Sequence, residues 1–149
     1  MPILDTAVVA AVTGLDAANG GVEKALLVED DAAADARLVL SPYVAEVVED
    51  PADDDYTANY AAFRRAVARL AFARVAPTMG SFRPTSGGGF QRASGPESAR
   101  VEFLSPRQVR ELAAELRDQA LGDLAALRLR VEERDLADAL VVTPALYIC

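Results

Sequence analysis

The sequence contains no histidine and no tryptophan, and its one cysteine is Cys149. Without histidine, the chain lacks the His-assisted serine or cysteine nucleophile of many hydrolases and any histidine metal ligand. One cysteine excludes a disulfide framework and a cysteine-based zinc site within a single chain. No apolar run reaches the roughly 18 residues of a membrane span, and residues 1–5 lack the basic and apolar regions of a signal peptide. We therefore expect a protein away from membranes that works by binding and is not an enzyme.

Lysine is also scarce, since Lys24 stands against fourteen arginines. The net charge of −8 is unevenly distributed: residues 1–56 carry −11, residues 57–110 carry +7 and residues 111–149 carry −4. Two interpretations are open. The acidic and arginine-rich elements neutralise each other within one fold, or they form complementary faces between neighbouring copies.

The spacing of apolar residues predicts a mainly α fold: a helical bundle with one long closing helix. Short helices are expected over residues 4–15 and 32–40 and after Ser41-Pro42, with Asp30-Asp31 capping the second. A longer helix starts near Tyr56 and is expected to end at Pro77 and Gly80. The closing helix starts with a Ser105–Gln108 capping box and runs to about Arg134. The core positions expected from this spacing are Tyr60, Phe63, Val67, Leu70, Val109, Leu112, Leu116, Leu124 and Leu127.

Two segments do not fit the helical pattern. Residues 81–104 are rich in glycine and arginine and predict a long loop or a small β-hairpin. Residues 141–149 are apolar and β-branched, with Pro144, and predict an extended C-terminal docking tail. We thus expect a single helical domain over 1–140, with an insertion at 81–104.

Other patterns predict little chemistry. Gly87-Gly88-Gly89 lacks the lysine and Ser/Thr of a phosphate-binding P-loop. The acidic runs at 29–31 and 53–55 lack the alternation of a calcium loop, and helix capping with solvation accounts for both. No metal or cofactor is therefore expected. For Arg64, Arg65, Arg69 and Arg74, pairing with acids inside the fold is favoured over contact with nucleic-acid phosphate.

The order of signals resembles the head–tail connector (adaptor) family of tailed bacteriophages. The matching stretches are Asn59–Phe63 through Ala76-Pro77, then Ser86–Arg92, then Arg117–Leu124, and together the resemblance covers about residues 30–130. It implies a virion protein of the neck, made in the host cytoplasm, that forms a ring of about twelve copies. Such a ring binds the portal protein and the next neck or tail protein and continues the DNA channel, through which packaged DNA passes without sequence-specific binding.

Under this hypothesis the loop and the tail carry the partner contacts. The predicted binding residues are Phe82, Arg83, Phe90, Arg92 and Arg100 in the loop, and Val141, Val142, Leu146, Tyr147 and Ile148 in the tail. A second hypothesis from another class is a cellular helical regulator that contacts a peptide or nucleic acid through the arginine-rich segment 64–110. Steep salt dependence of DNA affinity would distinguish it from the first.

Overall fold

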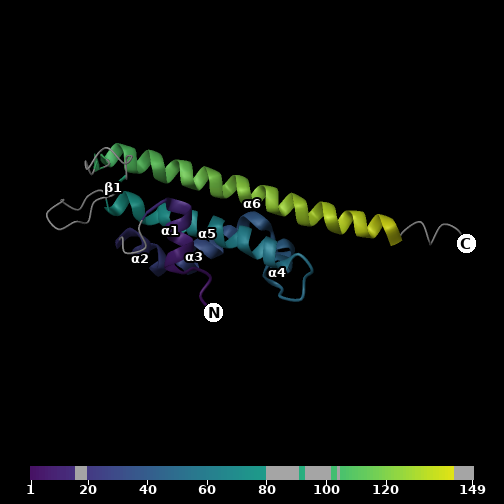
Figure 1. The fold of residues 1–149 in the computed structure, drawn as a ribbon. Helices are drawn as coiled ribbons and strands as arrows, with labels where there is room; N and C mark the ends of the chain where they lie inside the picture. Colours follow the sequence, from purple (N-terminus) through teal and green to yellow (C-terminus); the bar gives the residue numbers. More distant parts are fainter. Residues whose placement is uncertain (16–19, 80–90, 93–101, 104, 143–149) are drawn as a thin grey trace, which may run out of the picture.

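The computed structural model describes residues 1–15, 20–79, 91–92, 102–103 and 105–142. Over these ranges the chain is mainly α, as predicted (Figure 1). The strands β1 (Gln91–Arg92) and β2 (Glu102–Phe103) pair antiparallel, with Gln91 opposite Phe103. The helices within the described ranges are α1 (Thr6–Thr13), α2 (Gly20–Leu27), α3 (Glu29–Leu40), α4 (Pro42–Glu49), α5 (Tyr56–Met79) and α6 (Pro106–Val142).

Helix α5 is the centre of the bundle. It packs against α1, α2, α3, α4 and α6. Alanine fills many of its buried positions, and because an alanine side chain is small, several helices approach the α5 backbone at once. Phe63 and Phe72 are fully buried among them and are the largest fully buried side chains. The buried alanines of α5 are Ala66, Ala68, Ala71 and Ala76.

Helix α6 lies along α5 and buries one face against it. Seven of the nine core positions expected from the sequence are buried, while Leu112 and Tyr60 lie half-buried at the edge of the core. The buried residues of α6 are Val109, Ala113, Leu116, Ala120, Leu124, Leu127 and Val131. The apolar spacing in the sequence thus identified the correct face of this helix.

Helix α6 is longer than predicted. It continues past Arg134 to Val142, so the expectation that the extended tail starts at residue 141 is wrong for Val141 and Val142. Most residues between Arg134 and Ala139 favour the helical state, and no glycine or proline interrupts the chain before Pro144. The remaining tail residues lie outside the described part of the chain.

Side-chain caps begin helices α1, α4 and α6. Asp5 accepts a hydrogen bond from the Val8 amide at 2.8 Å and caps α1. The predicted capping box is confirmed, because the Gln108 amide donates to the Ser105 hydroxyl while the Gln108 side chain accepts from the Ser105 amide at 2.8 Å. At α3 the predicted cap is wrong: the helix starts directly after α2 at Glu29, so Asp30 and Asp31 lie within its first turn.

Helix α5 ends at Met79, directly before Gly80, so of the two predicted breakers Pro77 does not end it but lies inside its last turn. Because a proline lacks the amide that bonds to the carbonyl of the preceding turn, Pro77 removes one helical hydrogen bond, and only two helical residues follow it. Nearby, the Thr78 hydroxyl donates to the Val75 carbonyl at 2.6 Å. The helix therefore continues to Met79.

The N-terminal residues are fixed by contacts that the sequence pattern did not reveal. The Glu29 carboxylate accepts hydrogen bonds from the amides of Ile3 and Leu4 at 3.1 and 2.9 Å. The Arg64 guanidinium donates to the Ile3 carbonyl at 2.5 Å. Both Ile3 and Leu4 are buried, so this short segment belongs to the core.

Two glycines test the helix assignments, because replacing them by alanine is expected to change the free energy of unfolding in opposite directions. Gly122 lies exposed within α6, and an added Cβ would meet no atom within 4 Å. We expect Gly122→Ala to raise the free energy of unfolding by about 0.5–1 kcal/mol, because alanine loses less backbone entropy in a helix. Gly14 follows α1 at a φ of 69°, in the left-handed region that disfavours a residue with a Cβ. We therefore expect Gly14→Ala to lower the free energy of unfolding by about 1 kcal/mol. Urea denaturation followed by circular dichroism measures both; a destabilised Gly122→Ala chain would contradict a continuous α6.

Candidate interaction surface

An apolar stripe runs along the outer face of α6. We call it the α6 stripe, and its members are leucines with exposed fractions between 37% and 62%. Their positions differ by 8, 7 and 4 residues, so at ~100° per residue they fall within about 100° of one another. The α6 stripe consists of Leu121, Leu129, Leu136 and Leu140.

The stripe faces away from the bundle. On the same helix, Leu124, Leu127 and Val131 point into the core, and the stripe is rotated from them by roughly 150°. Val131 is the last buried residue of α6, and every described side chain from Leu136 to Val141 is exposed. Figure 1 shows this end of α6 extending beyond α4. The helix thus has a second apolar face that its own chain does not cover in the described structure.

Most of the arginines on α5 are engaged within the fold. Arg64 pairs with Asp5 of the N-terminal segment at 2.9 Å. Arg74 pairs with Asp35 of α3 at 2.5 Å. Arg69 pairs with Asp123 of α6. Intramolecular pairing, the favoured interpretation of these arginines, is confirmed for all three.

Arg65 is the exception on α5. It is exposed, and it has no ion pair within the described residues. It borders a hollow of about 380 Å³ between α5 and α6, beside Arg130. Three of the four arginines of α5 are therefore neutralised within the fold, and Arg65 keeps its positive charge at the edge of the helix.

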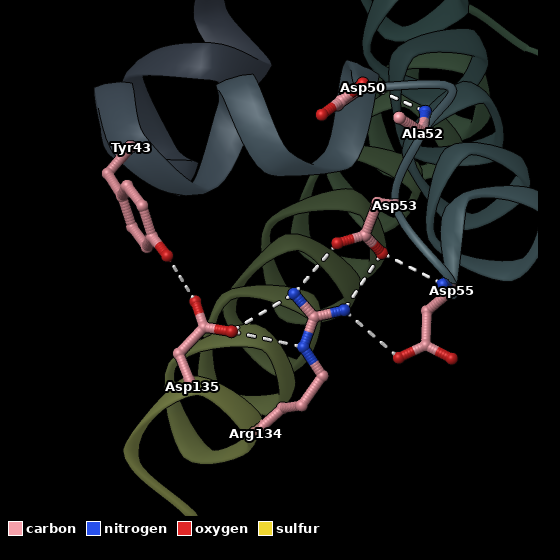
Figure 2. Close-up of polar contacts among 7 residues, drawn as sticks. All are labelled: Tyr43, Asp50, Ala52, Asp53, Asp55, Arg134 and Asp135. Carbon is pink, nitrogen blue, oxygen red and sulfur yellow. Dashed lines mark hydrogen bonds and ion pairs between the residues drawn. The ribbon is translucent and has the colours of Figure 1, made fainter. Parts of the chain in front are cut away.

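A cluster of polar residues fastens α6 to the loop between α4 and α5. The Arg134 guanidinium donates to both carboxylate oxygens of Asp53 at 2.9 Å, and it also pairs with Asp55 and Asp135 (Figure 2). Tyr43 of α4 donates its hydroxyl proton to Asp135 at 2.5 Å. We call this set the Arg134 clamp. Two parallel bonds between Arg134 and Asp53 fix both charge and orientation.

The clamp shifts the pKa values of its members. Hydrogen bonding to Arg134, together with the Asp55 amide, holds the pKa of Asp53 below its usual value of 3.8. Hydrogen bonding to Asp135 raises the pKa of the Tyr43 phenol. The contact with Asp53 raises the pKa of Arg134 further above its already high value, so the guanidinium remains charged at any pH at which the protein folds.

The clamp also gives the acidic run at 53–55 a structural use. Asp53 and Asp55 are both bonded to Arg134.

Across the described residues, no group of three or more carboxylates or cysteines is placed to hold a metal ion. Within the same part of the chain, none of the helices is long and apolar enough to cross a membrane.

The structure places only some of the predicted binding residues. Arg92 lies in β1, near the start of α6, whereas Val141 and Val142 lie at its far end. A helix of 37 residues is about 55 Å long, so Arg92 and Val141 lie far apart, near opposite ends of α6. Outside the described residues are Phe82, Arg83, Phe90, Arg100, Leu146, Tyr147 and Ile148.

The α6 stripe itself was not identified from the sequence. The leucine spacing is visible in the sequence, but the pattern predicts a helix end near Arg134, and Leu136 and Leu140 then fall outside the helix. Only Leu121 and Leu129 then lie on this face, and two exposed leucines are common on a surface helix. Extending the helical wheel to residue 142 would have shown the second apolar face.

Comparison with protein-family models, curated proteins and solved structures gives no match for this chain.

The lowered pKa of Asp53 predicts how stability depends on pH. A carboxyl group whose pKa is lower in the folded state stabilises the fold above its unfolded pKa, and that contribution is lost as pH falls through the folded pKa. We expect the urea midpoint to fall between pH 5 and pH 2.5, and to fall less in Asp53→Asn, which lacks this group. Asp54→Asn changes an exposed neighbour without an ion pair in the described part and is the control. Equal pH profiles for wild type and Asp53→Asn would contradict the Arg134 clamp.

Proposed function

We propose that this chain is a structural assembly protein of a tailed-phage neck: a head–tail adaptor that forms a ring between the portal and the tail. Its action is binding between subunits and involves no catalysis. The observation that supports this function is the α6 stripe, an apolar helix face that the described part of the same chain leaves in water.

The physical argument concerns what covers this stripe. Moving one half-exposed leucine from water into a packed contact is worth about 1 kcal/mol, so four in line favour association. A ring contact is heterologous, meaning that one surface binds a different surface of the next copy. We assign the stripe to contact with a second copy, because the unequal charges of the segments of this chain suit unlike faces meeting.

The resemblance to the connector family supports the remaining parts of the proposal. It suggests a ring of about twelve copies that binds the portal protein on one side and the next neck or tail protein on the other. The net charge of −8 repels phosphate, so packaged DNA would pass through the channel without sequence-specific binding. The loop 81–104 and the tail after Val142 are the proposed contacts with these partners.

The alternative, a cellular module that binds peptide or nucleic acid through residues 64–110, has less support. Arg64, Arg69 and Arg74 already bind carboxylates of this chain. A phosphate ligand would have to displace those carboxylates. On α5 and α6, this leaves Arg65 and Arg110 as the arginines of the segment without an ion pair among the described residues.

The central prediction concerns assembly. We expect the double variant Leu129→Glu/Leu136→Glu to remain folded, because both side chains are exposed, and to fail to form the ring, because charges would be buried at the contact. Native mass spectrometry and negative-stain microscopy of the free chain, and of the chain with portal rings as template, measure assembly.

Leu38→Glu is the matched control, since Leu38 is an 82% exposed leucine on α3 and does not belong to the α6 stripe. It should assemble as wild type does. A wild-type chain that stays monomeric with and without the portal, or rings that form equally well in the double variant, would overturn the proposed function.

A further inference from the structure

A hollow with three arginines lies between α3, α5 and α6. Its volume is about 440 Å³, and its floor is apolar and built from small residues. We call it the arginine hollow. Its charged members are Arg74, Arg110, Arg117 and Asp35.

The arginine hollow carries positive charge that no carboxylate of the described residues neutralises. Arg74 is paired with Asp35 at 2.5 Å and with Asp31 at 3.5 Å. Arg110 and Arg117, in contrast, are exposed and have no ion pair within the described residues. They are seven residues apart on α6 and therefore lie on the same side of it. Two guanidinium groups above an apolar floor suit a partner that brings carboxylates on a packed surface.

The opposite end of the molecule carries acidic residues that fit this description. Glu46 on α4 and Asp54 in the following loop are exposed and have no ion pair in the described part of the chain, and Asp50 lies exposed between them. We call these three residues the acidic end. It adjoins the Arg134 clamp through the 50–55 loop (Figure 2). Arg110 and Arg134 are about 36 Å apart along α6, so the acidic end cannot reach the hollow of its own chain.

We infer that the arginine hollow receives the acidic end of a second copy of this chain. The inference rests on the proposed ring and identifies its contact. A surface at one end of the molecule that binds a different surface at the other end is a head-to-tail contact, which closes into a ring when the rotation between copies allows it. Leu121, the first residue of the α6 stripe, follows Arg117 by one helical turn, so the hollow and the stripe form one continuous contact surface.

A nucleic-acid backbone fits the hollow less well. Asp35 lines it and Asp31 borders Arg74, and these carboxylates repel a polyphosphate chain. A protein surface can place its own carboxylates beside the arginines and its apolar atoms on the floor. Binding of DNA is therefore an outcome that the experiment must distinguish.

The experiment uses charge reversal on each side of the contact. We expect Arg110→Glu/Arg117→Glu and, separately, Glu46→Arg/Asp54→Arg to weaken self-association by about tenfold or more, because each places like charges together. An equimolar mixture of the two variants should recover the ring, since each then meets a complementary surface on the other. Analytical ultracentrifugation and native mass spectrometry measure the assembled fraction, and circular dichroism checks the fold.

Arg65→Glu/Arg130→Glu is the matched control. It reverses two other exposed arginines that also have no ion pair in the described structure and that line a different hollow. This variant should assemble as wild type does.

The outcomes separate this inference from the proposed function. If wild type forms rings and Arg110→Glu/Arg117→Glu forms them equally well, the inference is overturned while the proposed function stands. Failure of the mixture to recover assembly also overturns it. If wild type binds duplex DNA with an affinity that falls with salt and is lost in this variant while assembly persists, the occupant is nucleic acid and the inference is wrong. A wild-type chain that never associates overturns both.

Discussion

The small size of the side chains along α5 is the constraint on which the bundle depends. Because alanines fill much of its buried surface, α5 can be contacted by α1, α2, α3, α4 and α6 together. Bulkier residues would hold the surrounding helices apart and open voids that the short N-terminal helices could not fill. In this arrangement each short helix buries little apolar area, so contacts between distant parts of the chain must also stabilise the fold.

Charged contacts supply much of that long-range connection. Arg64, Arg74 and Arg134 each join segments far apart in the sequence, and Glu29 holds the backbone of the N-terminal residues. Exposed ion pairs contribute little individually, but the bidentate contact of Arg134 with the half-buried Asp53 joins α6 to the loop between α4 and α5. The acidic and basic segments of the sequence are thus used first within the fold. Among the charges that remain, those of the arginine hollow and of the acidic end lie at opposite ends of the molecule.

The sequence predicted the helices and their buried faces better than their ends. Phe63, Val67, Leu124 and Leu127 follow helical spacing, and burial of apolar surface enforces that pattern in the fold. The end of α6 depends on weak local preferences after Arg134 and on a clamp made by residues from another part of the chain, neither of which leaves a periodic signal. The same holds for the candidate surfaces. The α6 stripe required the true helix length, and the arginine hollow required knowing which of the fourteen arginines had found partners.

The far end of α6 has a further consequence for how the helix forms. Starting a helix is unfavourable because several residues are fixed for one hydrogen bond, whereas each added residue is nearly neutral. The packed portion up to Val131 and the Arg134 clamp supply the start, so residues 136–142 form by propagation. The free-energy difference between the helical and unwound states of these residues is therefore small. A partner that binds this end can shift that balance without disturbing the folded bundle.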